Sequence, residues 1–366
     1  MSPDAKNIQT WSDRITLEST AEMASLGFDS GVRQAKARMA PLAELVRRLN
    51  VIAAFEKTDP HAIISPVLKR NYRQVDCIPS ATNINSMQFR ADDEVLVAEG
   101  CGPRIYKKDK DSWSGRSISD VRDPLGICAI RENGVLVMYP DKPAGFFIYS
   151  DALNIWTDLS EVVAPEEPII QVAHHVPTDS IVASHGNIIE IIDFTADGFK
   201  KTEQFPKLEA DIGYIHMKPN GDIFTSIKSG NVMCWRKAQG AYQLVGFLFG
   251  SGGGVECIRH LPNGAVITAG SDHNVRVYTE NASGEWESEV NSVHKFEVRQ
   301  VQALQDGRFI SLSGDNTMRL WERKENWTQE VLLEVDDIKS FQFLSDGKIA
   351  LLPRHRNVIE IYDGEV

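Results

Sequence analysis

Short runs rich in β-branched and aromatic residues alternate with tight-turn sequences along most of this 366-residue chain. Several of the turns are Asn-Gly or Asp-Gly pairs, which favour two-residue β-hairpins because these residues tolerate positive φ. The pairs are Asn133-Gly134, Asn220-Gly221, Asn263-Gly264, Asp306-Gly307 and Asp346-Gly347. In residues 298–333, four such runs follow one another, and the third alternates apolar and polar positions from Thr317 to Trp321. Alternation with period two indicates strands, so the pattern predicts units of four short strands.

The units repeat with a period close to 43 residues. An aromatic residue, or isoleucine in one unit, closes the third run of each unit. These positions are Tyr106, Tyr149, Ile192, Trp235, Tyr278, Trp321 and Tyr362, at successive intervals of 43, 43, 43, 43, 43 and 41 residues. One four-stranded sheet cannot bury both of its faces, whereas seven sheets stacked around an axis can. The period therefore predicts an all-β fold, a seven-bladed β-propeller over residues 71–366.

The last unit ends at Tyr362 and contains only three strands. One period before Trp113 the chain reaches residues 71–79, where Tyr72 occupies the place that Trp327 takes at the start of a fourth strand. We expect residues 71–79 to complete the last blade. Such a strand joins the two ends of the ring and removes its open edge.

Residues 1–70 lack the repeat and form a separate region. In residues 31–57 the apolar positions roughly follow a helical period, and Pro41 kinks or divides this helix. Asp59 followed by Pro60 is typical of the start of a second, short helix. We predict a small N-terminal α-helical extension, which either caps the propeller or binds a second partner.

Charge and cysteine content argue against several classes of function. The formal net charge is −12, and an acidic surface repels phosphate backbones, so nucleic-acid binding is disfavoured. The five cysteines are widely spaced without a Cys-x-x-Cys motif, which argues against a disulfide framework and a thiolate zinc site. The N-terminus lacks the apolar core of a signal peptide, and no run reaches 18 apolar residues. We expect no membrane span and a cytoplasmic protein; a bacterial protein delivered into a host cell fits the same sequence.

The sixth unit contains His294, Ser311, Asp315 and Trp321 together with the turn that ends at Gly307. This arrangement resembles the WD-repeat family, and the resemblance implies that the four side chains form a structural hydrogen-bonded set inside the blade. No unit ends in the Trp-Asp pair that gives the family its name. The resemblance supports the propeller fold and says little about function.

Residues 41–70 are faintly similar to an F-box, with Leu45, Leu49 and Asp59 at matching places. The family's tryptophan is missing, and Tyr72 would have to substitute for it. The resemblance implies docking to a ubiquitin-ligase core. A substrate adaptor of a ubiquitin ligase is therefore an alternative function.

Few residues suggest catalysis. His174 and His175 are adjacent, and neighbours in a strand point to opposite faces, so they do not easily share one metal ion. Ser311, His294 and Asp315 include the residue types of a hydrolase triad, but the blade set accounts for them. We expect no catalytic residue, no metal site and no cofactor. A propeller enzyme with a central-channel site is a second alternative.

In propellers of the resembled type, the loops before the first strand and between the second and third strands share one face. Seven residues before each repeat marker lie Glu99, Lys142, His185, Lys228, Ser271, Gly314 and His355, and the loops before the first strands add Asp211, Glu297 and Asp337. Arg354 and Arg356 make the last sector basic. Mixed charge suits a protein or peptide partner better than a uniform array of phosphates. We therefore expect a non-catalytic protein–protein interaction scaffold that binds its partner on this face.

Overall fold

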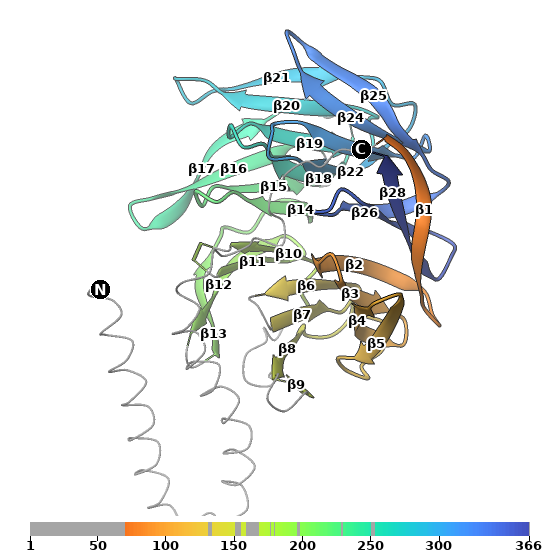
Figure 1. Ribbon diagram of the computed structural model, residues 1–366. Helices are drawn as coiled ribbons and strands as arrows, with labels where there is room; N and C mark the ends of the chain where they lie inside the picture. Colours follow the sequence, from red (N-terminus) through yellow and green to blue (C-terminus); the bar gives the residue numbers. More distant parts are fainter. Residues whose placement is uncertain are drawn as a thin grey trace, which may run out of the picture. The chain divides into compact units, whose positions relative to one another are not determined.

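The computed structural model describes residues 70–130, 134–150, 155–158, 168–175, 177–178, 180–195, 198–227, 230–249 and 253–365. In these residues the chain forms 28 β-strands and no helix, and the strands make seven four-stranded sheets (Figure 1). The fold is therefore the predicted all-β seven-bladed β-propeller. The expected helical extension and the F-box-like segment up to residue 69 lie outside the described residues.

The first three blades each use four consecutive strands, in sheet order. Blade 1 consists of β2 (Ile84–Ala91), β3 (Glu94–Glu99), β4 (Gly102–Asp109) and β5 (Ser112–Ser117). Blade 2 consists of β6 (Gly126–Ile130), β7 (Gly134–Met138), β8 (Gly145–Ser150) and β9 (Ile155–Asp158). Blade 3 consists of β10 (Gln171–His175), β11 (Ser180–His185), β12 (Ile188–Thr195) and β13 (Gly198–Gln204).

Blades 4 to 6 repeat the same order. Blade 4 consists of β14 (Ile212–Met217), β15 (Ile223–Ile227), β16 (Val232–Ala238) and β17 (Ala241–Leu248). Blade 5 consists of β18 (Val255–His260), β19 (Val266–Gly270), β20 (Val275–Glu280) and β21 (Trp286–Asn291). Blade 6 consists of β22 (Val298–Ala303), β23 (Phe309–Ser313), β24 (Thr317–Arg323) and β25 (Trp327–Glu334).

Blade 7 combines the two ends of the described chain. It contains β26 (Ile338–Phe343), β27 (Ile349–Pro353), β28 (Val358–Glu365) and, as its fourth strand, β1 (Arg70–Pro79). β1 runs antiparallel to β28, and Figure 1 shows the two strands side by side. Tyr72 of β1 is buried, and its hydroxyl donates a hydrogen bond of 3.1 Å to the carbonyl of Gly347. The blade therefore uses the tyrosine that the F-box resemblance would need.

All site residues discussed below lie in one compact unit, which comprises Asp59–Phe147 and Asp158–Val366.

The hydrophobic core lies between neighbouring sheets. Between blades 5 and 6, Val275 and Val277 of β20 belong to one buried cluster with Phe309 of β23 and Trp321 of β24. The rings of Phe309 and Trp321 stack with centroids 5.5 Å apart. The aromatic residue that marks the repeat in the sequence is thus a side chain that fills the space between two blades.

Glutamine side chains connect the innermost strands of neighbouring blades. Gln302 of β22 accepts a hydrogen bond from the backbone N–H of Phe343 in β26 (2.8 Å) and donates one to its carbonyl (3.2 Å). Gln300 makes the same pair of bonds with Phe341, at 3.0 and 2.7 Å. We call this arrangement an amide clamp. It satisfies backbone groups on the edge of an innermost strand, where no further strand is available.

Two more clamps continue around the ring. Gln342 of β26 accepts a hydrogen bond from the N–H of Phe89 in β2 (2.8 Å) and donates one to its carbonyl (3.2 Å). Gln88 of β2 accepts a bond of 2.8 Å from the N–H of Ala129 in β6, but its buried Nε2 has no hydrogen-bond partner among the described residues. The clamp between blades 1 and 2 is therefore half formed.

Candidate functional site

Five innermost strands in the described part of the chain carry a β-bulge near their first residue. The strands are β2, β14, β18, β22 and β26, and the residues that lack a ladder partner are Asn85, Gly213, Glu256, Arg299 and Lys339. A bulge re-aims its extra residue and bends the strand. Ser86, Gln300 and Ser340, which follow three of these positions, line a cavity in the central channel. The bulges therefore stand beside the channel.

Three bulge side chains donate a hydrogen bond to a backbone carbonyl at or just before the first strand of the next blade. The bonds join Arg299 Nη1 to Ile338 O (2.9 Å), Lys339 Nζ to Ile84 O (3.4 Å) and Asn85 Nδ2 to Pro124 O (2.9 Å). The bulges thus hold neighbouring blades together and place two cations, on blades 6 and 7, beside the channel.

The loops before the first strands are hydrogen-bonded to the loops between the second and third strands. The backbone bonds join Gly100 N to Asn83 O, Ser271 N to Gly254 O, Gly314 N to Glu297 O and Arg354 N to Asp337 O, each at 2.9 Å. Both sets of loops therefore lie on one face. We call the surface that these two sets of loops form the loop face.

Most of the residues proposed from the sequence as partner contacts are accessible on the loop face. Asp211, Ser271, His355 and Arg356 are exposed, and Lys142, Glu297, Gly314 and Asp337 are half-buried. The Lys142 ammonium lies 4.5 Å from the ring centroid of Tyr139. Lys228 lies outside the described residues.

Two of the proposed contact residues are buried instead. Glu99 is fully buried, where its Oε1 accepts a hydrogen bond of 2.5 Å from the hydroxyl of Tyr106. His185 is buried with Nδ1 3.0 Å from the carbonyl of Pro168 and Nε2 3.3 Å from a carboxylate oxygen of Glu190. Neither side chain is available to a partner in this structure.

The loop of residues 354–357 forms the basic sector of the loop face. Arg354 Nε and His355 Nε2 lie 3.6 and 3.1 Å from the two carboxylate oxygens of Asp337. Burial, and then the nearby charge of Arg354, lower the pKa of Lys339. The side chains of Arg354 and Lys339 thus stand close together on blade 7, with the carboxylate of Asp337 beside Arg354.

Two exposed aromatic residues on the loop face were not predicted from the sequence as partner contacts. Phe249 and Phe296 precede the first strands of blades 5 and 6, and 63% and 55% of their surfaces are exposed. The Phe249 ring stacks on Phe247 with centroids 5.5 Å apart, and the His273 ring lies 6.3 Å from that of Phe296. The sequence feature that could have indicated them is an aromatic residue in a connection between strands, such as Phe296 between Lys295 and Glu297.

Blade 6 contains a closed hydrogen-bonded set. Trp321 Nε1 donates to Ser311 Oγ (2.7 Å), which lies 2.8 Å from His294 Nε2, and His294 Nδ1 lies 2.9 Å from Asp315 Oδ2. With a neutral histidine, every proton has an acceptor: the serine donates to Nε2, and Nδ1–H donates to the carboxylate. Ser311 is fully buried, so its hydroxyl cannot reach a substrate.

Electrostatics favour these protonation states. Burial lowers the pKa of His294 despite the nearby carboxylate of Asp315. Burial raises the pKa of Asp315, but hydrogen bonds from Thr317, the Lys295 backbone and His294 outweigh it, so the net shift is downward. The set therefore holds a neutral imidazole beside a carboxylate.

The comparisons with known proteins agree with this geometry. The family described as "WD domain, G-beta repeat" matches residues 242–279. The crystal structure of the WD40 β-propeller domain of Doa1 superposes with a TM-score of 0.64 at 14% sequence identity, over 81% of this chain and 98% of that domain. These comparisons show the β-propeller fold, with a WD-repeat match over part of blades 4 and 5. No curated protein matches it at a significant level.

The family match falls on β17 to β20, whereas the complete side-chain set lies in blade 6. Blade 4 of this propeller keeps one part of the set, since Trp235 Nε1 donates to Thr225 Oγ1 (2.9 Å) as Trp321 does to Ser311. In the described part of the chain, no three His, Cys, Asp or Glu side chains gather in a way that could hold a metal ion. Nor does a helix long and apolar enough to cross a membrane occur among the residues described.

Proposed function

We propose that this propeller is a non-catalytic interaction scaffold that binds a protein or peptide segment on the loop face. The observation that carries the proposal is the exposure of Phe249 and Phe296 on the face that also presents the basic loop 354–357. Aromatic residues and arginine are enriched in protein interfaces and supply most of their binding energy. Two exposed phenylalanines in the connections that lead into adjacent blades provide such anchors.

The scaffold below this face supports the proposal. The loops are joined to one another by backbone hydrogen bonds, and the bulge side chains join neighbouring blades. A surface that is already ordered loses little conformational entropy when it binds. Loops held on a rigid scaffold are also where binding residues are most often found.

The test uses full-length protein in affinity purification with quantitative mass spectrometry. One variant carries Phe249→Ser with Phe296→Ser, and a second carries Lys142→Ala with His355→Ala. We expect proteins recovered with wild type to be depleted at least tenfold by the phenylalanine variant and less by the second. The larger effect follows because truncating a central aromatic anchor costs about 2 kcal/mol or more.

The matched control is Lys324→Ala with Glu325→Ala, in the turn between β24 and β25 on the opposite face. This control should recover the same proteins as wild type. Partner recovery that survives both loop-face variants, or that is lost equally in the control, argues against the loop face as the binding surface.

A further inference from the structure

A cavity of about 210 Å³ lies in the central channel. Its lining residues come from the innermost strands of all seven blades and from Met138 at the end of β7. An engineered apolar cavity of about 150 Å³ holds a benzene molecule. The channel cavity therefore has room for a small ion or a small organic molecule.

The charge of the cavity wall is positive. Among the described residues that line it, Arg259 carries the only permanent charge, and none is an aspartate or glutamate. The whole chain has a net charge of −12. A positive cavity inside an acidic protein attracts an anion locally, whereas the surface as a whole repels one.

Arg259 is held in a fixed position. Its Nη1 donates to the hydroxyl of Tyr214 and to the carbonyl of Ile258, the latter at 2.7 Å, and the guanidinium carbon lies 5.5 Å from the ring centroid of Tyr214. A guanidinium group has five N–H donors in a planar fork that matches carboxylate and phosphate oxygens. A fixed guanidinium loses little freedom when an oxyanion binds.

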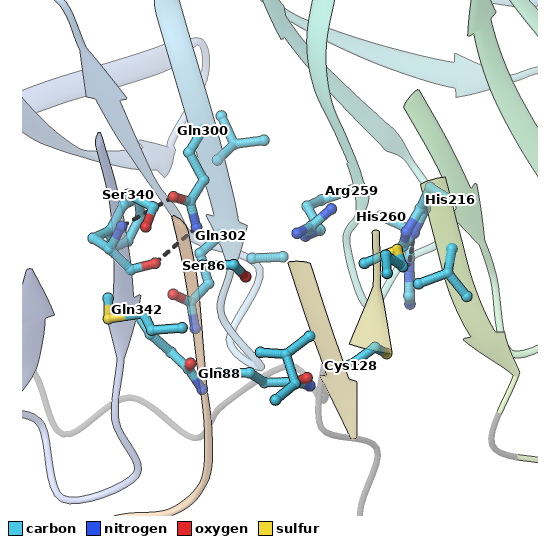
Figure 2. A pocket seen from close by; sticks show the side chains of 17 residues that line it. Ser86, Gln88, Cys128, His216, Arg259, His260, Gln300, Gln302, Ser340 and Gln342 are labelled. Atoms are coloured by element: carbon cyan, nitrogen blue, oxygen red, sulfur yellow. Dashed lines mark hydrogen bonds between the residues drawn. The ribbon is translucent and has the colours of Figure 1, made fainter. Parts of the chain in front are cut away.

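Two histidines stand on the same wall. His216 Nε2 lies 2.8 Å from His260 Nδ1, and the rings stack with centroids 5.1 Å apart. One ring of such a pair donates and the other accepts. Figure 2 shows Arg259 between this pair and the glutamine side chains of β22 and β26. Side-chain nitrogen atoms from blades 4 and 5 therefore line the same cavity.

Other ligand classes fit the wall less well. A metal cation would find no carboxylate among the described lining residues. An apolar molecule would gain no hydrogen bond from the arginine, histidine and serine side chains that line the wall. We propose that the channel cavity binds a compact oxyanion, a phosphate or a carboxylate group, through Arg259 and the His216–His260 pair.

The residues next to the cavity wall support this assignment. The bulge residues Arg299 and Lys339 directly precede Gln300 and Ser340, which line the cavity. Glu256 is the one acidic residue among the bulge positions named above. The charge of Arg299 is paired with Glu297, whose Oε1 lies 2.8 Å from Arg299 Nη2. Lys339 adds positive charge beside the cavity, which raises the local concentration of anions.

The experiment is isothermal titration calorimetry on the full-length protein at constant ionic strength, with sodium phosphate and sodium acetate titrated separately. We expect saturable binding at one site for at least one of the two anions. A phosphate-only signal identifies a phosphate site, and an acetate-only signal identifies a carboxylate site. We expect Arg259→Gln to weaken binding roughly tenfold or more, because a charge-assisted hydrogen bond is lost.

Arg323→Gln is the matched control, since Arg323 pairs with Glu289 at the exposed edge of blades 5 and 6, and it should bind like wild type. If Arg259→Gln is not folded by circular dichroism, His260→Gln replaces it, with weaker binding again expected. The proposal is overturned if neither anion gives a saturable signal, or if the control loses as much affinity as the channel variants. Partner recovery by the loop-face variants is a separate readout, so either proposal can fail without the other.

Discussion

Ser311 is the centre of the hydrogen-bonded set in blade 6. Its hydroxyl accepts from Trp321 and lies within hydrogen-bond distance of His294. A serine between histidine and aspartate suggests a hydrolase when the sequence is considered alone. The structure places the indole of Trp321 against the oxygen that would act as nucleophile, in a fully buried site. Here the serine, the histidine and the aspartate stabilise the blade.

Ser311→Ala removes the acceptor of the Trp321 N–H and the partner of His294 Nε2. Leaving a buried polar group unsatisfied costs roughly 1–3 kcal/mol, so we expect the free energy of unfolding to fall by an amount in this range. Urea titration followed by tryptophan fluorescence measures the change. Ser114→Ala, at an exposed serine in β5, is the control and should be within about 0.5 kcal/mol of wild type.

The pH dependence of stability tests His294. Because its pKa is lowered in the folded state, the unfolded chain binds more protons as the pH falls below about 6.5, the ordinary value for histidine. Stability is therefore fully present above that pH and decreases below it. Asp315, whose pKa is also lowered, adds a second loss below about pH 4.

We expect His294→Gln to show a shallower decrease than wild type between pH 6.5 and 5 in denaturant titrations. Equal slopes for the two proteins would show that other groups dominate this pH range. A denaturant series at pH 8 sets the reference, since the His294 contribution to the slope is absent there.

At the scale of the element, the innermost strands are joined by amide clamps and by bulge side chains. Each clamp depends on one glutamine whose carbonyl and amide match the N–H and C=O of a residue in the next blade. Three of the clamps make both bonds, and the one from Gln88 makes one. The junctions between blades therefore differ in how many glutamine hydrogen bonds join their innermost strands.

Gln302→Leu should destabilise the protein by roughly 1–3 kcal/mol, because the N–H of Phe343 loses its acceptor in a buried position. Gln88→Leu should cost less, since only one bond is lost. Differential scanning calorimetry measures both changes. Gln243→Leu, exposed on β17, is the control, and an equal effect at all three positions would contradict a special role for the clamps.

The repeat period, the blade number and the strand order could be predicted from the sequence because aromatic markers fill the space between blades at a fixed spacing. The burial of Glu99 and His185 could not. Both end their strands, because the loops that follow them, residues 100–101 and 186–187, are only two residues long. In blade 7 the corresponding loop spans residues 354–357, so His355 lies in the loop. Counting from a marker assumes equal loops, and a difference of two residues moves a side chain from the surface into the blade.

The bulges and the clamps escaped prediction for another reason. A bulge adds one residue to a strand without a composition signal, as the different residues at Asn85, Glu256 and Lys339 illustrate. A glutamine in a strand is equally compatible with solvent and with a backbone partner on the next blade. Both features depend on the distance between neighbouring strands, which no local pattern in the sequence encodes.

For the whole molecule, ring closure depends on β1. Residues near the start of the described chain pair with residues at its end, and Ile78 of β1 is almost completely buried in a cluster with β27, β28 and blade 1. In blade 7, therefore, strand pairing and side-chain packing hold together two segments that are far apart in the chain.

Ile78→Ala should lower stability by about 2–5 kcal/mol and the melting temperature by several degrees, as expected for a large-to-small change in a packed core. Val75→Ala, at a half-exposed position of the same strand, should have little effect. Deletion of residues 71–79 should lower the melting temperature much further. A deletion that melts within two degrees of wild type would show that β1 contributes little.

The place of β1 in blade 7 has a consequence during synthesis. β1 leaves the ribosome first among the described strands, yet its partner Val358–Glu365 is made about 280 residues later. At about 5–20 residues per second this interval lasts roughly 15–60 s. Throughout it, an unpaired strand carrying Tyr72 and Ile78 is exposed beside a growing, open ring. Translation speed and chaperone supply should therefore affect the yield of folded protein.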